Sequence, residues 1–205
     1  MDSIIIIDKI LIPSLQRLYK IDYNNIKFGV SERNICARLA LHIENVMREY
    51  DELLVVKCFQ NYFVDVEYNR MVNGNLKHYE NSQHRPQYMV SDLLIQSRGY
   101  ERNLLAVEMK RKNNYRGVKT DKERLLSLVS LGNPDFIDKC VYETQVGAFI
   151  KFSPETVKIE IYECINGLPA ETQELQYMYS ENSRENPLLL LDKITFDKYR
   201  PYGRF

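Results

Sequence analysis

The sequence has no tryptophan, little glycine and no net charge. Its 8 glycines form none of the glycine-rich loops that hold phosphates or dinucleotides, and no G-x-S-x-G turn is present. Lysine and arginine together number 28, as do aspartate and glutamate. This balance argues against a protein that binds nucleic acid by bulk charge, as histones do, although it is compatible with a local basic surface. The absence of tryptophan beside 15 tyrosines says little about function.

The sequence also lacks clustered metal ligands of the zinc type. Its four cysteines form no C-x-x-C pair, and its three histidines have no ligand spacing. We expect the cysteines to be reduced, buried thiols of a cytoplasmic protein. These residues are Cys36, Cys58, Cys140 and Cys164, and the histidines are His42, His78 and His84.

No long apolar run is present. The apolar residues 4–7 are flanked by Asp2 and Asp8, follow no basic region and are too short to span a membrane. We therefore expect neither a signal peptide nor a membrane partner, and a cytoplasmic location.

The composition is that of a folded globular chain, with 44% hydrophobic and 27% charged residues. A length of 205 residues suits one sizeable core. We expect a single domain over residues 1–205, with a core at about 31–165. The expected N-terminal helical extension covers residues 1–30, and a C-terminal extension covers 166–205.

Hydrophobic periodicity predicts the order helix, three strands, helix, two strands. Apolar spacing predicts a helix over residues 4–19, weakened by Pro13, and a second helix from the cap Ser31 to Tyr50. The predicted strands are 63–70, 88–96, 104–110, 146–152 and 157–164, with a helix over 121–130. Because a helix connects two strands, we expect an α/β fold with a mixed central sheet flanked by helices.

Acidic residues interrupt two of the apolar strands, at Asp92 and Glu108. A buried carboxylate is costly unless it is paired or binds a cation. Alternation along a strand places Glu108 and Lys110 on one face, and Asp92 can lie opposite them on the neighbouring strand. Hard oxygen ligands suit Mg²⁺ or Mn²⁺, and the lysine suits stabilisation of developing negative charge. The alternative is a buried ion pair without chemistry, and spacing alone leaves both open.

Asp92 followed by Glu108-x-Lys110 resembles the PD-(D/E)xK signature of restriction-endonuclease-like nucleases. Ser91 stands where the motif name has proline, a position that varies widely. The predicted element order around the motif matches that family's αβββαβ core. The run 64–70, Arg98-Gly99 and residues 103–105 also resemble a group of uncharacterised prokaryotic members.

The resemblance implies roles for individual residues. Asp92, Glu108 and the main-chain carbonyl of Met109 would bind the metal, and Lys110 would be the catalytic lysine. Glu32 corresponds to an acid that many members carry on the helix before the sheet, and its spacing from Ile35 and Leu39 predicts an inward position. The alternative for Glu32 is an acid in the first turn that is favoured by the helix dipole.

Two further polar groups are weaker candidates. Glu67 and Asn69 share one face of the first predicted strand and would supply a second metal site or orient Lys110; the alternative is a solvated strand face. The basic loop after Lys110 suits contact with a phosphate backbone, and its tyrosine suits base stacking, unless the loop is merely solvated. The nucleic-acid-binding candidates in it are Arg111, Lys112, Arg116 and Lys119.

The sequence therefore predicts a Mg²⁺-dependent nuclease, with DNA favoured over RNA as substrate. The alternative is a non-catalytic nucleic-acid-binding or assembly module on the same fold. No helix-turn-helix or zinc finger is evident, so we expect low specificity, or specificity supplied by a homodimer or a protein partner. The apolar N-terminal helix is either a dimer face or a cap on the core.

Overall fold

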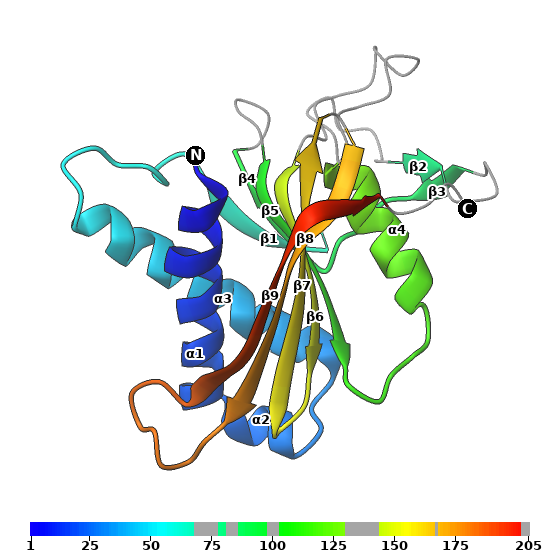
Figure 1. Ribbon diagram of the computed structural model, residues 1–205. Helices are drawn as coiled ribbons and strands as arrows, with labels where there is room; N and C mark the ends of the chain where they lie inside the picture. Colours follow the sequence, from blue (N-terminus) through cyan, green and yellow to red (C-terminus); the bar gives the residue numbers. More distant parts are fainter. Residues whose placement is uncertain (68–77, 81–85, 98–102, 130–143, 167, 202–205) are drawn as a thin grey trace.

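The computed structural model describes residues 1–67, 78–80, 86–97, 103–129, 144–166 and 168–201. Within these ranges seven strands form one mixed sheet in the order β1-β4-β5-β6-β7-β8-β9, and β2 pairs with β3 separately (Figure 1). The strands are β1 (Phe63–Val66), β2 (His78–Glu80), β3 (Pro86–Tyr88), β4 (Leu93–Gln96), β5 (Asn103–Arg111), β6 (Thr144–Phe152), β7 (Thr156–Ile165), β8 (Leu168–Tyr179) and β9 (Leu188–Pro201). The predicted mixed α/β architecture is confirmed at this level.

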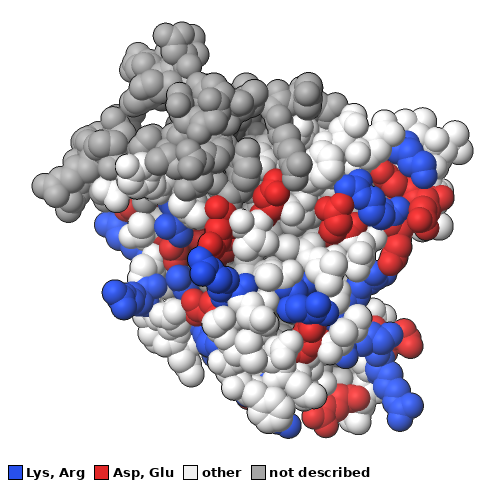
Figure 2. Space-filling model, turned by 180° about the vertical axis from the view of Figure 1, so that it is seen from behind, with Lys and Arg blue, Asp and Glu red and all other residues white. Residues whose placement is uncertain are grey.

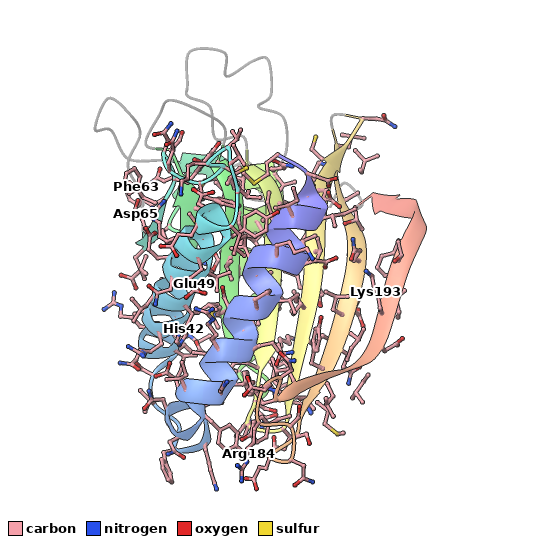
Figure 3. All side chains as sticks on the ribbon, turned by 90° about the vertical axis from the view of Figure 1, so that its left-hand side faces the viewer. His42, Glu49, Phe63, Asp65, Arg184 and Lys193 are labelled. Atoms are coloured by element: carbon pink, nitrogen blue, oxygen red, sulfur yellow. The ribbon has the colours of Figure 1, made fainter. Side chains whose placement is uncertain are left out.

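Helices cover both faces of the sheet. One face carries the π-helix η1 (Ile5–Leu11), which continues as α1 (Ile12–Ile21), together with α3 (Glu32–Glu52). Figure 3 shows α1 and α3 side by side across that face. The short helix α2 (Tyr23–Lys27) connects them, and α4 (Val118–Val129) packs on the opposite face (Figure 1).

The two faces have separate apolar cores, and β5 contributes to both. Leu105 and Val107 join the larger core under α1 and α3, whereas Ala106 joins the smaller core under α4. The first seven residues of β5 are all buried, which is the pattern of a central strand. Its apolar sequence predicted that position.

The helix that leads into the sheet is the element best predicted from sequence. Ser31 caps α3, because its hydroxyl accepts a hydrogen bond from the Asn34 N–H at 3.3 Å. Ile35 and Leu39 are fully buried on the predicted inward face. The helix ends at Glu52, close to the predicted Tyr50.

The N-terminal helix changes type where a weak point was expected. Pro13 lies in the first turn of α1, where its missing N–H costs little, and the π-helix precedes it. The apolar side chains of η1 are buried in the larger core, so this face caps the core and is not presented as a dimer face. They are Ile6, Ile7, Ile10 and Leu11.

Two predicted strands were too long, and two further strands were not predicted. The strand predicted over 88–96 begins only at Leu93. Tyr88, where the prediction began it, is the last residue of the separate strand β3. The first strand ends at Val66, because the next residue, Glu67, has a positive φ of 53° that turns the chain out of the strand. The extension 166–205 contains the strands β8 and β9, which the sequence did not predict. The Arg98-Gly99 turn and Cys140 lie outside the described residues.

Cys36 is a free, buried thiol as expected. Cys58 and Cys164 are free but only half-buried, so their predicted burial was wrong. Among the helices that the structure describes, none is both long and apolar enough to cross a membrane.

Candidate active site

The site is built on the antiparallel pair β4 and β5. Leu93 lies opposite Val107, and the same register places Asp92 opposite Glu108 on the face that α4 covers. The Asp92 carboxylate accepts a hydrogen bond from the Met109 N–H at 2.8 Å. Glu108 is fully buried, with 0% exposure, whereas Asp92 is half-buried at the start of its strand. The two carboxylates thus converge from neighbouring strands.

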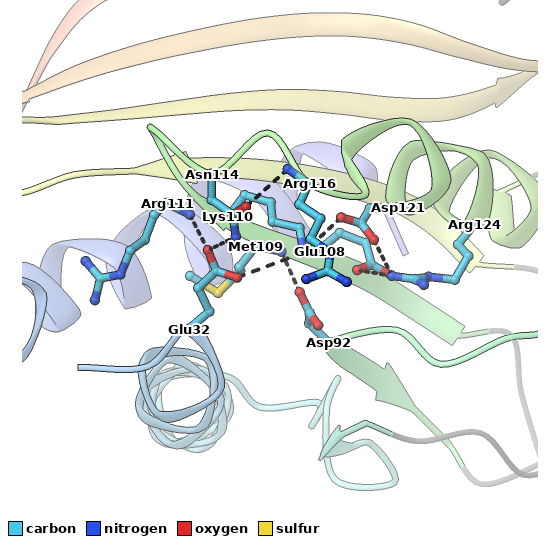
Figure 4. Close-up of polar contacts among 10 residues, drawn as sticks. All are labelled: Glu32, Asp92, Glu108, Met109, Lys110, Arg111, Asn114, Arg116, Asp121 and Arg124. Atoms are coloured by element: carbon cyan, nitrogen blue, oxygen red, sulfur yellow. Dashed lines mark hydrogen bonds and ion pairs between the residues drawn. The ribbon is translucent and has the colours of Figure 1, made fainter. Parts of the chain in front are cut away.

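Lys110 shares the face of Glu108, two residues along β5, and is held by carboxylates from two helices. Its ammonium lies 3.1 Å from Asp121 Oδ2 on α4 and 3.9 Å from Glu32 Oε2 on α3 (Figure 4). Burial alone would lower the pKa of Lys110, but Asp121 and the other carboxylates outweigh it and raise that pKa. Lys110 is therefore a fixed positive charge at neutral pH.

Sequence reasoning missed two residues of this centre, Asp121 and Arg124. Arg124 donates two parallel hydrogen bonds to Glu108, at 3.0 Å to Oε1 and 2.9 Å to Oε2. It also donates to Asp121 Oδ1 at 2.6 Å. The available signal was their i, i+3 spacing on the helix after the motif strand, but only the packing of α4 reveals what they contact.

Burial dominates the electrostatics of both strand carboxylates. It raises the pKa of Glu108 well above its usual 4.5, against the opposing effect of Arg124. It also raises the pKa of Asp92 from its usual 3.8, while the Met109 N–H and Lys110 act to lower it. A further cation nearby would lower the pKa of both carboxylates, because charge compensation favours their ionised forms.

Glu32 lies on the Lys110 side of the centre, as its inward spacing predicted. Its Oε1 accepts hydrogen bonds from the Arg111 N–H at 2.9 Å and the Asn114 amide at 2.8 Å. The start of α3 is thereby tied to the loop that follows β5 (Figure 4).

Glu67 does not join the centre through its side chain. Its exposed carboxylate accepts two hydrogen bonds from Arg33, so it neither orients Lys110 nor shares a strand face with it. Its N–H instead donates to the Asp92 carbonyl at 3.2 Å, which steadies the backbone there. Asn69 lies outside the described residues.

The basic loop divides into an anchor and exposed cations. Arg111 donates to the Ile26 and Val30 carbonyls, and Figure 4 shows its guanidinium turned away from the carboxylates. This placement makes Arg111 an anchor and not a phosphate contact, contrary to its predicted role. Lys112, Arg116 and Lys119 are exposed, as contact with a phosphate backbone requires.

The charge of the centre fits a divalent cation. When its four carboxylates are all ionised, they exceed the two cations Lys110 and Arg124 by two negative charges. The carboxylates are Glu32, Asp92, Glu108 and Asp121. Among the described residues no three Asp, Glu, His or Cys side chains are already gathered as a ligand set; Lys110 and Arg124 lie between the carboxylates.

Comparison with known proteins gives no further guide to the site. No protein-family model, curated protein or solved structure matches this chain significantly. What the site does must therefore be inferred from its geometry.

Proposed function

We propose that the protein is a metal-dependent nuclease with a restriction-endonuclease-like core, and that it hydrolyses phosphodiester bonds, with DNA as the expected substrate. The observation that carries this proposal is the convergence of Asp92, Glu108 and Lys110 from two adjacent strands onto one buried face. The order α3-β1-β4-β5-α4-β6 supports it, with β5 and β6 parallel and α4 crossing between them. The β2-β3 pair is then an insertion between β1 and β4.

The residues present suit Mg²⁺ or Mn²⁺. Asp92 and Glu108 would hold the ion together with the Met109 carbonyl, an all-oxygen donor set of the kind these ions prefer. The Arg124 fork leaves capacity on Glu108, because an ionised carboxylate offers about four lone-pair sites and the fork uses two. The ion would supply Lewis-acid polarisation of the phosphate and a water of lowered pKa.

The protein's own residues divide the remaining work. The Lys110 ammonium, fixed by Asp121 and Glu32, orients the attacking water and stabilises negative charge that develops on the phosphate. Arg124 favours the ionised form of the buried Glu108 and holds its carboxylate in place. The exposed side chains of Lys112, Arg116 and Lys119 hold the polynucleotide backbone near the centre.

A non-catalytic nucleic-acid-binding or assembly module is the second candidate. The pairing of Glu108 with Arg124 and of Lys110 with Asp121 favours it, since such pairs also occur as purely structural features. Asp92 argues for the nuclease. In the described part of the chain, no cation lies within ion-pair distance of this half-buried carboxylate, and a structural ion-pair network leaves that unexplained.

The proposal is tested by incubating the protein with supercoiled plasmid, linear duplex, single-stranded DNA and RNA, each with Mg²⁺, Mn²⁺ or EDTA. The nuclease proposal predicts cleavage with an ion and none in EDTA. A preparation of the Asp92→Asn variant serves as the control for contaminating nucleases. If the protein binds nucleic acid but cleaves it under none of these conditions, the non-catalytic module would be established.

A further inference from the structure

The loop between β5 and α4 presents an aromatic ring beside the proposed centre. Tyr115 is 72% exposed, the largest exposed fraction among the tyrosines whose side chains the structure describes. The Lys151 ammonium on β6 lies 5.5 Å from the centroid of its ring. A lysine over a tyrosine ring makes a cation–π contact that holds the ring in place. The 72% exposure of Tyr115 leaves it accessible to a ligand.

The strand register places Lys151, which contacts this ring, next to Lys110, the proposed catalytic lysine. Lys151 is the partner of Lys110 across the parallel pair β6 and β5, and neighbouring strands are about 4.8 Å apart. Both lysines project from the face that carries α4, because Glu108 and Phe149 precede them by two residues on that face. Tyr115 and Lys151 thus lie one strand away from the centre.

Three cations on this loop and on β6 have no carboxylate partner among the described residues. Elsewhere in the described chain, cations are commonly paired with an acid, as Arg17 is with Glu49 and Lys158 with Glu174. Within the described residues, no carboxylate lies within ion-pair distance of Lys112, Arg116 or Lys151. Figure 2 shows acidic and basic side chains interspersed over the described part of one face. A local excess of positive charge in a chain of zero net charge indicates an anionic ligand.

We propose that Tyr115 and Lys151 form a stacking platform for an unpaired base, and that the substrate of this site is a single-stranded polynucleotide. This inference rests on the proposed nuclease function and narrows its substrate. In a duplex, neighbouring base pairs cover the faces of each base, whereas an unpaired base can stack on an exposed ring. Lys112, Arg116 and Lys151 then neutralise the adjacent phosphates.

The depth of the centre agrees with a single strand. Glu108 is fully buried and Asp92 is half-buried, so the scissile phosphate must reach a point below the surface. A flexible single strand can bend into such a point with one base on Tyr115. A duplex is much stiffer than a single strand, so it would have to be deformed to do the same.

Binding is measured without cleavage, by fluorescence anisotropy of labelled oligothymidine, oligouridine and a DNA duplex of equal length, in EDTA. Wild-type protein should bind the single strands at least about tenfold more tightly than the duplex. Tyr115→Ala should weaken single-strand binding about tenfold, whereas Tyr115→Phe, which keeps the ring, should not. Lys151→Gln should weaken binding and reduce its salt dependence by about one phosphate contact.

Matched controls separate the platform from general surface effects. Tyr88→Ala removes another exposed tyrosine, 62% exposed on β3, and Lys193→Gln removes an exposed lysine on β9 (Figure 3). Neither should change the affinity for oligothymidine. Comparing oligothymidine with oligouridine separates DNA from RNA as the single strand. Melting temperatures of all variants should stay at the wild-type value, because the altered side chains are exposed or half-buried.

Equal affinity for single strands and duplex, or an unchanged affinity of Tyr115→Ala, would overturn the platform. If the wild type nevertheless cleaves duplex DNA with Mg²⁺, the nuclease proposal stands and only its substrate is wrong. If the protein binds single strands through Tyr115 but cleaves nothing with Mg²⁺ or Mn²⁺, the nuclease proposal fails and the platform stands.

Discussion

At the scale of single residues, Asp92 and Lys110 carry different parts of the proposed chemistry. Asp92 is a half-buried carboxylate to which the described residues contribute one hydrogen bond, from Met109. Lys110 is a cation held between Asp121 and Glu32. Loss of Asp92 should therefore affect ion binding, and loss of Lys110 should affect the reaction.

The first prediction concerns metal binding by Asp92. Mg²⁺ or Mn²⁺ should raise the melting temperature of the wild type by mass action, since only the folded state holds the ligands together. Asp92→Asn should abolish this gain. Glu52→Gln, which removes an exposed acid at the end of α3, is the control and should keep it. An equal gain in wild type and Asp92→Asn would remove Asp92 from the metal site.

The second prediction concerns pH. Burial raises the pKa values of Glu108 and Asp92 above their usual 4.5 and 3.8, and an ion binds only the deprotonated forms. The gain in melting temperature with Mg²⁺ should therefore disappear on acidification already above pH 4.5. In the metal-free protein the free energy of unfolding should fall as pH rises through these raised pKa values, because the folded state binds the protons more tightly.

Both parts are measured by melting curves with and without Mg²⁺ across the weakly acidic range. A gain that persists undiminished down to the usual carboxyl pKa of 4.5 would mean that burial does not control ion binding.

Much of the site at this scale follows from the sequence. Asp92 and Glu108 were predicted because each interrupts an apolar strand, and Lys110 was predicted because it follows Glu108 by two residues on the same strand face. The sequence predicted Arg111 as a nucleic-acid contact, because a basic loop does not reveal which of its side chains will donate to main-chain carbonyls of the same protein. The same limit applies to Glu67, whose positive φ removes it from the strand face.

At the scale of elements, α4 completes the centre. It supplies Asp121 and Arg124 from one helical face, and it packs against β6 at Gly147. The sequence predicted a helix here but began it at Asp121, whereas it starts at Val118. Helix propensity and periodicity locate a helix, but the rotation that aims Asp121 and Arg124 at the sheet is set by tertiary packing.

The third prediction concerns the Arg124 fork. Arg124→Gln leaves the fully buried Glu108 without its cation and should cost about 3–5 kcal/mol of unfolding free energy in EDTA. Because an ion at Glu108 would compensate, Mg²⁺ should stabilise this variant more than the wild type. Urea unfolding measures both. The double variant Glu108→Gln, Arg124→Gln removes both charges and should recover part of the loss. A small loss with no larger gain from Mg²⁺ would contradict the assigned role of Arg124.

The fourth prediction concerns the seating of α4. A Cβ added at Gly147 would lie 2.9 Å from Val129 Cγ2, so the Val129 side chain or α4 as a whole must shift. Gly147→Ala should cost about 1–3 kcal/mol of unfolding free energy through overpacking. It should also lower the cleavage rate, because α4 carries Asp121 and Arg124. Unchanged stability and rate would show that the position of α4 is not set by this contact.

At the scale of the whole molecule, one sheet brings the site together from distant parts of the chain. The centre lies where the start of α3, the pair β4-β5 and the start of α4 meet. The order of these elements followed from periodicity and from the Ser31 cap. The strands β8 and β9 did not, because their mixture of polar and apolar residues is only partly buried near the edge of the sheet. A weakly alternating edge strand carries little sequence signal.

The measurement that tests the central claim most directly is the cleavage rate of Lys110→Ala with Mg²⁺, taken together with its melting temperature. Asp121 keeps its hydrogen bond from Arg124 when Lys110 is removed, so the variant should fold. Ion binding should persist, since the site becomes more negative. The account predicts a melting temperature near that of the wild type and a rate lowered about 100- to 1,000-fold. A stable Lys110→Ala variant with the full wild-type rate would contradict it.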